Sequence, residues 1–385
     1  MIVHFIRLHQ FLEYTIEYFE EVNPKNNIYY LISGGNKHNF KREIEDKVNV
    51  LEVGSVNYRN LLDHCNQYDT FIFHSLHNDF FPIIDHIPED RTLCWIMYGM
   101  EVFGIFKEIR NNTFLPETRK FYRFSKKGII DHFKPVYRKL IGDLDNEKKY
   151  LKYIKRFHYC AAPHPTLFEI LREKGILNLE FLKFTYYNIE ETVGEQLLNE
   201  VANGDNIFFG NSATFSNNHL DGFQILQKVT IHHKKLIVPL SYGDREVVKK
   251  IVFNGKKMFG SSFVPVLNYL PREEYNKLLL SCRFVIMNFL RPQARGNILT
   301  ALWLGAKVFL QEENIFYDEF RSKGMTIFSM NDFHNDPADV FTALSTEEIA
   351  SNRTILLKHY NKENAIAYTK NLVKKLYNSK VRNSG

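Results

Sequence analysis

The sequence predicts an α/β protein with two doubly wound, Rossmann-like domains, and three observations support this fold class. Short apolar runs alternate with longer helical patterns, and the alternation restarts after Thr192. The length of 385 residues suits two domains of about 100–200 residues each. The composition, with 44% hydrophobic and 24% charged residues, excludes a disordered or fibrous chain.

The first half contains apolar runs that predict parallel strands, at 2–6, 28–32, 48–53, 70–74, 92–97 and 156–162. Helical patterns at 10–21 and 58–67 lie between some of them. In the second half the strands are expected at 207–210, 235–239, 257–259, 284–288 and 307–311. Helices are expected there at 218–232, 244–254, 272–281, 297–304 and 315–322.

These patterns predict a first domain over 1–190 and a second over 191–360. The last segment, 361–385, reads as an amphipathic helix that returns to the first domain. Two doubly wound domains that face each other form a central cleft at the carboxyl ends of their strands, where ligands bind in this architecture.

The spacing of the cysteines and the lengths of the apolar runs indicate the cellular compartment in which the protein works. The four cysteines are far apart and form no C-x-x-C pair, which argues against zinc, redox and disulfide-stapled folds. The start of the chain reads as a strand, and the apolar stretch 296–310 is shorter than the roughly 20 residues that a bilayer span needs. We expect a cytoplasmic protein or one at the cytoplasmic face of a membrane.

One segment carries the excess positive charge. Between residues 107 and 156 there are 15 Lys and Arg against 6 Asp and Glu, whereas the rest of the chain has 35 against 38. Aromatic residues interleave with the basic ones, which suits an anionic lipid surface or a nucleic-acid backbone. The alternative is a solvated helix pair with its aromatic residues in the core. We expect the segment to be a helical insertion in the first domain, on its acceptor and membrane side.

The clearest local pattern follows the run 207–210, where the small, polar loop GNSATFSNN precedes a helix. Gly210 lets a ligand approach the backbone, and Ser216, Asn217 and Asn218 are competent helix N-caps. Free N–H groups at a helix start suit a phosphate, so Asn211 and Ser212 join the candidate donor-binding residues. The alternative is an ordinary capped strand–turn–helix.

A second pattern, RPQARGN, opens the helix after the strand near 284–288. Arg291 and Gln293 with Gly296 and Asn297 at a strand-to-helix junction describe an anion site. A diphosphate between the two loops would meet backbone donors from one and a guanidinium from the other. Surface arginines in a loop are the alternative.

The candidate catalytic residues lie at predicted strand ends of the first half. His74 in FIFHS or Glu101 in WIMYGMEVF could accept a proton from a sugar hydroxyl as general base. A structural histidine is the alternative for His74. Metal signals are weak: Asp143 and Asp145 sit in the basic segment and follow no strand, so no metal or other cofactor is expected.

The run GNSATFSNNHLDGFQIL resembles the signature of the bacterial TDP-N-acetylfucosamine:lipid II N-acetylfucosaminyltransferases, glycosyltransferase family 56. The resemblance continues through VPLSYGD, EEYNKLLLSCRFVIMNFLRPQARGN and LGAKVFLQEENIFY, and in the first half through FIFHS and WIMYGMEVF. It covers most of the chain and is strongest from 206 to 317.

This resemblance implies a GT-B fold with the donor held mainly by the second domain, where Tyr242 joins the candidate donor-binding residues. It implies metal-independent transfer from a dTDP-linked amino sugar to an undecaprenyl-diphosphate-linked saccharide, as in enterobacterial common antigen assembly. It also implies peripheral attachment to the inner membrane, and no nucleic-acid partner.

The sequence departs from many GT-B enzymes at one place. Two glutamates eight residues apart, the second of which binds ribose, are replaced by Pro292 and Thr300. Glu313 and Asn314 are a possible substitute. A non-catalytic nucleotide-sugar or glycan-binding protein on the same scaffold remains an alternative, as does a nucleic-acid-binding protein, although no known reader motif is present.

Overall fold

The computed structural model describes every residue except 10, 34–44, 107, 110–112, 141–145, 164, 232 and 384–385, and describes no side chains for 135–140 and 380–383. The chain divides into two compact units. Unit 1 comprises 1–107, 144–188 and 362–385, and unit 2 comprises 108–143 and 189–361.

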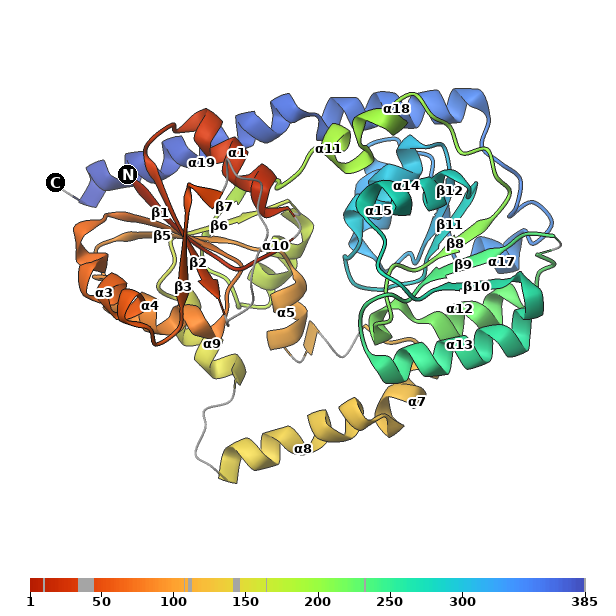
Figure 1. Ribbon diagram of the computed structural model, residues 1–385, viewed down its shortest axis with the longest axis horizontal. Helices are drawn as coiled ribbons and strands as arrows, with labels where there is room; N and C mark the ends of the chain where they lie inside the picture. The colour runs from red at the N-terminus through yellow and green to blue at the C-terminus, as the bar shows by residue number, and fades with distance from the viewer. Residues whose placement is uncertain are drawn as a thin grey trace. The chain divides into compact units, whose positions relative to one another are not determined.

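Unit 1 is built on a parallel sheet whose described strands run in the order β3-β2-β1-β4-β5-β6-β7. The strands are β1 Ile2–Ile6, β2 Asn27–Ser33, β3 Val48–Glu52, β4 Thr70–His74, β5 Thr92–Ile96, β6 Tyr159–Ala162 and β7 Glu180–Lys183. The helices are α1 Leu12–Val22, α3 Val56–His64, α4 Phe81–His86, α5 Met100–Ile105, α9 Asn146–Ile154, α10 Pro165–Glu173 and α19 Lys362–Asn383. In Figure 1, α1 and α19 cover one face of this sheet, and α3 and α4 cover the other.

Unit 2 repeats the topology with the described strand order β10-β9-β8-β11-β12-β13, again parallel. The strands are β8 Ile207–Phe209, β9 Leu236–Pro239, β10 Phe263–Val266, β11 Phe284–Met287, β12 Lys307–Leu310 and β13 Phe328–Ser329. The helices are α7 Pro116–Phe124, α8 Lys126–Leu140, α11 Ile189–Val193, α12 His219–Leu226, α13 Arg245–Phe259, α14 Arg272–Leu280, α15 Arg295–Trp303, α16 Ile315–Ser322, α17 Asp332–Asn335 and α18 Thr346–Tyr360. Figure 1 shows α12 and α13 on one face of the sheet and α14, α15 and α18 on the other.

The central strands of both sheets are buried on both sides, as the interior of a parallel sheet requires. All five residues of β1, β4 and β5 are buried, and so are all residues of β8, β9, β11 and β12. This burial explains why the strands read as continuous apolar runs in the sequence. The fold class is confirmed as two Rossmann-like units.

Two sequence predictions are wrong at the level of elements. The run 257–259 does not form a strand, because α13 continues to Phe259; the third strand of unit 2 is β10, after a turn at Gly260 with φ of 55°. Gly255 of α13 permits this packing, since a Cβ there would lie 2.3 Å from the ring of Phe263.

The basic segment is not wholly an insertion of the first domain. Residues 108–143 cluster with unit 2, and α7 packs on α12. Only the last part of the segment, with α9, lies in unit 1. The carboxyl-terminal helix α19 belongs to unit 1, where it packs on α1, β5 and β7.

Candidate functional site

The carboxyl edge of the unit 2 sheet contains a topological switch point between β8 and β11. These two strands are neighbours, but the chain leaves them toward opposite sides of the sheet, because β9 follows β8 on one side and β12 follows β11 on the other. The Gly210 N–H donates to Ile286 O at 2.9 Å, so the two following loops start side by side. Ligands bind at such points in doubly wound sheets.

We call residues 210–219 the donor loop. Gly210 opens it with φ of 69°, a left-handed conformation that glycine adopts without cost. A Cβ at this position would lie 2.9 Å from Asn217 Oδ1 and 3.1 Å from His219 Nε2. The loop therefore turns back over Gly210, and only glycine fits.

Asn217 shapes the donor loop from inside. Its Oδ1 accepts the Asn211 N–H at 3.0 Å, and its Nδ2 donates to Ser212 O at 3.0 Å and to Thr214 Oγ1 at 2.9 Å. Asn217 is fully buried and Ser212 is nearly so. These two predicted donor-binding residues thus hold the loop's shape and do not face a ligand with their side chains.

Gln293 bridges the two loops. Its Oε1 accepts from Arg291 Nε at 2.6 Å and from Ser216 Oγ at 2.8 Å, and its Nε2 donates to Asn211 Oδ1 at 3.3 Å. Asn211 in turn donates to Tyr242 Oη at 2.9 Å, and Tyr242 is 57% exposed. The structure thus joins five of the predicted donor-binding residues in one hydrogen-bonded network.

Arg291 supplies the positive charge of this network. Burial lowers the pKa of its guanidinium to about 10, against the opposing effect of Tyr242, so the group stays protonated at neutral pH. A cation in low-dielectric surroundings attracts an anion more strongly than one in water. The arrangement suits a phosphate, which accepts paired hydrogen bonds from a guanidinium.

The start of α15 adds backbone donors beside Arg291. The helix begins at Arg295, so Gly296 and Asn297 lie in its first turn, where N–H groups precede the helical ladder and the dipole favours an anion. The Asn297 side chain donates to Tyr275 Oη at 2.8 Å, which fixes this turn to α14.

Three polar residues in or near the loop between β11 and α15 do not take part in the donor network. Arg295 is buried, pairs with Glu319 at 3.0 Å and stacks on the Tyr360 ring, so it holds α15 to α16 and faces away from the donor network. Asn314 caps α16 and donates to Phe289 O at 2.9 Å and Arg291 O at 3.0 Å. It therefore supports the Arg291 backbone from within. Glu313 is exposed.

A buried amide pair was missed by the sequence reasoning. Asn288 Nδ2 donates to Asn218 O at 2.9 Å, and Asn218 Nδ2 donates to Asn288 O at 3.1 Å. Asn218 has φ of 49°, a left-handed conformation that asparagine tolerates better than most residues. The position of Asn288 directly after β11 was the available signal, but Asn218, just before α12, read only as a helix cap.

Unit 1 has the same switch point between β1 and β4, and Glu101 lies near it at the start of α5 after β5. Glu101 Oε1 accepts from Tyr98 N at 3.0 Å and Trp95 Nε1 at 3.3 Å. Within the described part of the chain, its buried Oε2 makes no hydrogen bond of acceptable geometry. Burial raises the pKa of Glu101 to about 7, although hydrogen bonds from Tyr98, Trp95 and Ser75 oppose the rise. Such a carboxylate can accept a proton near neutral pH.

His74 does not suit the role of base. It is 1% exposed, and both ring nitrogens are engaged: Nε2 with His4 Nδ1 at 3.0 Å and Nδ1 with Tyr98 Oη at 3.3 Å. Burial, together with the neighbouring His4 and His9, holds the pKa of His74 well below its usual range. The structural alternative for His74 therefore fits better than the catalytic one.

The hydrogen bonds around His74 form a chain in which each member accepts from the previous residue and donates to the next. The Phe11 N–H donates to His9 Nδ1 at 3.2 Å, so neutral His9 carries its proton on Nε2 and donates to Tyr98 Oη at 2.8 Å. Tyr98 then donates to His74, His74 to His4, and His4 to Asn27 Oδ1 at 3.3 Å. Every member is satisfied in its neutral form, which is typical of a structural network.

No cluster of three or more His, Cys, Asp or Glu side chains able to hold a metal occurs among the described residues. Asp143 and Asp145 lie outside them. Of the helices that the structure describes, none is both long and apolar enough to cross a membrane.

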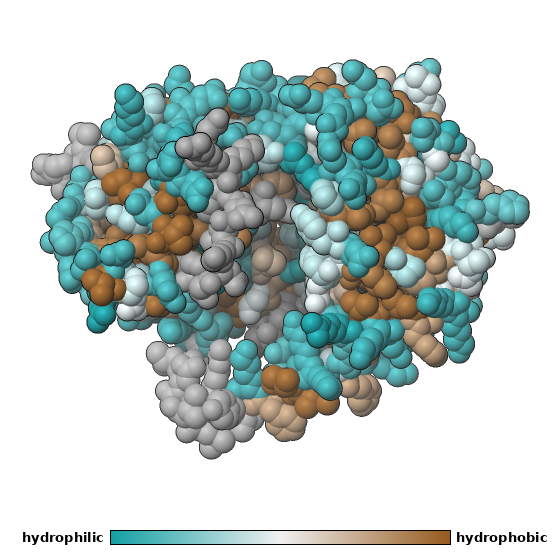
Figure 2. Space-filling view, viewed as in Figure 1, coloured by the Kyte–Doolittle hydropathy of each residue, from teal (hydrophilic) through white to brown (hydrophobic). Residues whose placement is uncertain are grey.

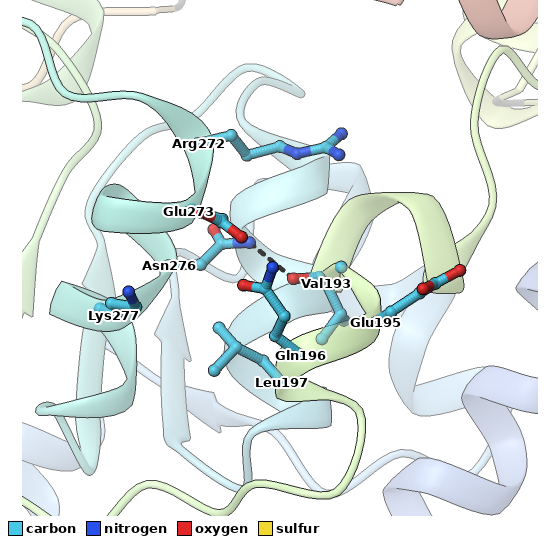
Figure 3. Close-up of a pocket in the computed structure, with 9 residues that line it drawn as sticks. Val193, Glu195, Gln196, Leu197, Arg272, Glu273, Asn276 and Lys277 are labelled. Atoms are coloured by element: carbon cyan, nitrogen blue, oxygen red, sulfur yellow. Dashed lines mark hydrogen bonds between the residues drawn. The ribbon is translucent and has the colours of Figure 1, made fainter.

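Unit 2 also contains a separate pocket of about 220 Å³ between α11, the following turn and α14. Figure 3 shows Asn276 hydrogen-bonded across it to Val193 O, at 2.8 Å, with Arg272 pointing away. None of the predicted donor-binding residues lines it.

Comparisons with solved structures agree with this fold. HepE from Anabaena in complex with UDP-glucose has a TM-score of 0.65 at 12% identity, covering 98% of this chain and 99% of that one. A glycosyltransferase from Rickettsia africae has a TM-score of 0.63 at 12% identity, covering 98% of both chains. An α,α-trehalose-phosphate synthase from Burkholderia vietnamiensis has a TM-score of 0.62 at 9% identity, covering 100% and 99%. At these identities the likeness shows the GT-B fold.

A comparison with curated protein sequences finds no match. A family model does match, over residues 185–367, and its description is 4-alpha-L-fucosyltransferase, glycosyl transferase group 56. The matched range contains the donor loop, Arg291, Gln293 and the start of α15. The resemblance seen in the sequence is therefore confirmed across this range, where the chain matches glycosyltransferase group 56, and the fold of the chain is that of GT-B glycosyltransferases.

Proposed function

We propose that this glycosyltransferase moves an amino-deoxy sugar of the 4-acetamido-4,6-dideoxygalactose type from a dTDP-sugar to an undecaprenyl-diphosphate-linked saccharide. The group 56 match over residues 185–367 supports sugar transfer. The sequence resemblance is the support for this donor and acceptor and for a role in bacterial surface polysaccharide synthesis like that of enterobacterial common antigen.

The observation that carries the donor assignment is the Gln293 bridge at the switch point of unit 2. It holds Arg291 and Asn211 together with the donor loop, beside the first turn of α15. A diphosphate bound there would meet a guanidinium and backbone N–H groups. These donors stabilise the negative charge that develops on the leaving dTDP, so we propose that transfer needs no metal ion.

We assign the proton acceptor to Glu101. The acceptor hydroxyl oxygen would bond to the anomeric carbon of the donor sugar as the bond to the diphosphate oxygen breaks. The electron pair of that bond leaves with dTDP, and the hydroxyl proton passes to Glu101 Oε2. The anchored Oε1 and the raised pKa of about 7 support this role.

An undecaprenyl-linked acceptor resides in a bilayer. We therefore propose that the protein works as a peripheral protein at the cytoplasmic face of the bacterial inner membrane. The basic and aromatic composition of residues 107–156 supports this location.

The test is a panel of dTDP- and UDP-sugars incubated with lipid-linked mono- and disaccharide acceptors, with products read by mass spectrometry. We expect transfer from a dTDP-amino sugar, unchanged by EDTA and reduced in Arg291→Ala. Calorimetric titration with dTDP is run alongside. Tight dTDP binding without transfer to any acceptor would favour a non-catalytic nucleotide-sugar-binding protein, and absence of both would overturn the donor site.

A further inference from the structure

The segment 113–140, which we call the arm, presents apolar side chains to solvent. Phe124 is 78% exposed, Ile130 63% and Phe133 61%, and Ile129 is half-exposed. In Figure 2, hydrophobic atoms gather over α8 among hydrophilic ones. Position 133 follows positions 130 and 129 by three and four residues, so Phe133 lies beside both on one stripe of α8. A stripe of large exposed apolar residues marks an interaction surface.

The charge around this stripe indicates its partner. Six exposed Lys and Arg lie on the described side chains of the arm, against two partly buried carboxylates, Glu117 and Asp131. Those basic residues are Arg119, Lys120, Arg123, Lys126, Lys127 and Lys134. Each basic residue near an anionic bilayer contributes about 1 kcal/mol of attraction, and the apolar residues enter the interface. The chemistry fits an anionic lipid surface.

The arm is attached to α12, directly after the donor loop. The Asp221 carboxylate accepts the N–H of Glu117 at 2.8 Å and that of Thr118 at 2.9 Å, and also the Thr118 hydroxyl at 2.6 Å. A side chain of α12 therefore caps the N-terminus of α7, where a negative charge is favourable.

Aromatic packing joins the arm to the donor loop itself. Phe215 lies within the loop, and its ring centroid is 5.1 Å from those of Phe121 and Tyr122 and 6.1 Å from that of Phe114. Phe215 is 5% exposed, and these three arm residues pack against it. Removing the arm would expose a large aromatic ring in the middle of the donor loop.

The strained residue of the donor loop depends on the arm as well. Asn218 Oδ1 accepts the Leu115 N–H at 2.9 Å, and Asn218 Nδ2 donates to Thr113 O at 3.2 Å. A left-handed asparagine costs free energy that its hydrogen bonds must offset. Without the arm, Asn218 would lose two of the partners that hold it, and the conformation of residues 211–218 would be less favoured.

The corner between α7 and α8 is tightly packed. Tyr122 Oη donates to Asp131 Oδ2 at 2.5 Å, and Ser125 Oγ donates to Tyr122 O at 2.7 Å. A Cβ on Gly128 would lie 1.8 Å from Tyr122 O, so only glycine permits this approach. α8 is therefore held against α7, which in turn contacts the donor loop through Phe121 and Tyr122.

From these contacts we propose that the arm is a membrane sensor of the donor site: docking of its Phe124–Ile130–Phe133 face on an anionic bilayer favours the arm position that braces the donor loop. This inference rests on the proposed function of that loop as the diphosphate site. Because coupling between two binding events is reciprocal, bilayer and nucleotide each strengthen the binding of the other by the same factor.

The experiment measures the Kd of dTDP with the full chain, first without lipid and then with vesicles of equal parts phosphatidylcholine and phosphatidylglycerol. Vesicles of phosphatidylcholine alone are the lipid control. We expect the anionic vesicles to lower the Kd of dTDP about fivefold or more, and dTDP to raise the vesicle-binding constant, measured by pelleting, by the same factor. Phe133→Ser should abolish the effect and leave the lipid-free Kd unchanged. The matched control is Phe253→Ser, since Phe253 is 66% exposed on α13 of the same unit.

Asp221→Asn tests the link between arm and loop. It keeps the side-chain size and weakens the cap on α7, so we expect weaker dTDP binding without lipid and a smaller response to vesicles, with pelleting retained. Equal Kd values for dTDP with and without anionic vesicles would overturn the coupling, and pelleting unaffected by Phe133→Ser would overturn the lipid face. If dTDP fails to bind at all while pelleting still depends on Phe133, the proposed donor site fails and the lipid face stands.

Discussion

The carboxyl edges of the two sheets share one topology but differ in chemistry. In unit 2 the edge at the switch point carries amides, hydroxyls and one guanidinium, joined through Gln293. In unit 1 the corresponding edge carries buried imidazoles and the carboxyl group of Glu101. The fold places loops at the same point in both units. The residues in those loops decide whether the edge is suited to bind an anion or to accept a proton.

The two edges also differ in the hydrogen bonds that satisfy their buried polar groups. The unit 2 loops satisfy their amides among themselves and keep a cation that attracts an anion. Unit 1 keeps its histidines neutral in a closed chain of hydrogen bonds and leaves one carboxylate oxygen unpaired among the described residues. An unpaired buried carboxylate oxygen is costly, which agrees with the raised pKa of Glu101.

The largest effect is expected from Glu101→Gln. The amide keeps an acceptor oxygen for Tyr98 N but cannot take a proton, so turnover should fall about 100- to 10,000-fold. In the wild-type protein, activity should rise with pH through about 7 as Glu101 ionises, and the variant should lose this rise. Initial rates between acidic and alkaline pH, with dTDP titration to show unchanged nucleotide binding, check the prediction. Wild-type turnover in the variant would remove Glu101 from the chemistry.

The next effect tests the unit 2 edge. Arg291→Ala should lower turnover about 10- to 1000-fold, the scale of losing one charged contact to the transition state. Arg291→Lys keeps the charge but loses the bond from Nε to Gln293, so it should recover part of the activity. Steady-state kinetics of both variants measure the loss, and an Arg291→Ala enzyme as active as the wild type would contradict an anion site here.

Glu101 also predicts a pH-dependent stability. Its pKa is about 7 in the folded chain and 4.5 as an ordinary value, so the folded state binds the proton more tightly. Stability from the protonated group is fully present below pH 4.5 and is lost as pH rises through 7. Glu101→Gln should therefore be more stable than the wild type by up to about 3 kcal/mol at pH 8, with no difference at pH 4.

Urea unfolding can measure this difference in unit 1 alone. The chain has two tryptophans, Trp95 in unit 1 and Trp303 in unit 2, so a Trp303→Phe background leaves Trp95 fluorescence as the reporter. A stability gap that does not change with pH would show that Glu101 has an ordinary pKa.

The smallest effects are expected from two glycine-to-alanine substitutions. Their comparison separates the cost of backbone strain from the contribution of the donor loop to dTDP binding. Gly210 and Gly175 both have φ of 69°, but a Cβ on Gly175 meets nothing within 4 Å. Gly175→Ala should cost about 1–2 kcal/mol of unfolding free energy and leave dTDP binding unchanged. Gly210→Ala adds the approach to Asn217, so it should cost more and also weaken dTDP binding. Equal effects of the two variants on dTDP binding would show that the shape of the donor loop is unimportant.

Much of the fold could be predicted from the sequence because buried parallel strands leave a continuous apolar signal. β1, β4 and α16 have the predicted bounds, and most other strands differ by one or two residues at their ends. β10 was missed because Pro265 lies inside it, and proline within a run argues against a strand. β7 lacks such a run as well, because it is a short edge strand with Glu180 and Lys183 exposed at its ends.

The candidate site was predictable in its loops but not in its side chains. A small, polar loop after a strand marks a position at the sheet edge, whatever its residues do there. Which residues face inward depends on backbone turns: Asn217 and Asn314 became internal supports because the chain folds back over them. The attachment of the arm to α12 depends on Asp221, a contact across more than 100 residues that no local pattern contains.

That attachment has a consequence for anyone who recombines halves of related enzymes. The two units are not consecutive pieces of chain, because residues 108–143 and 189–361 share one unit while 362–385 return to the other. A chimera joined at a single crossover near residue 188 would combine the arm of one parent with the α12 of another. Exchanging 108–143 together with 189–361 transfers one complete compact unit, and the carboxyl-terminal helix should stay with the recipient.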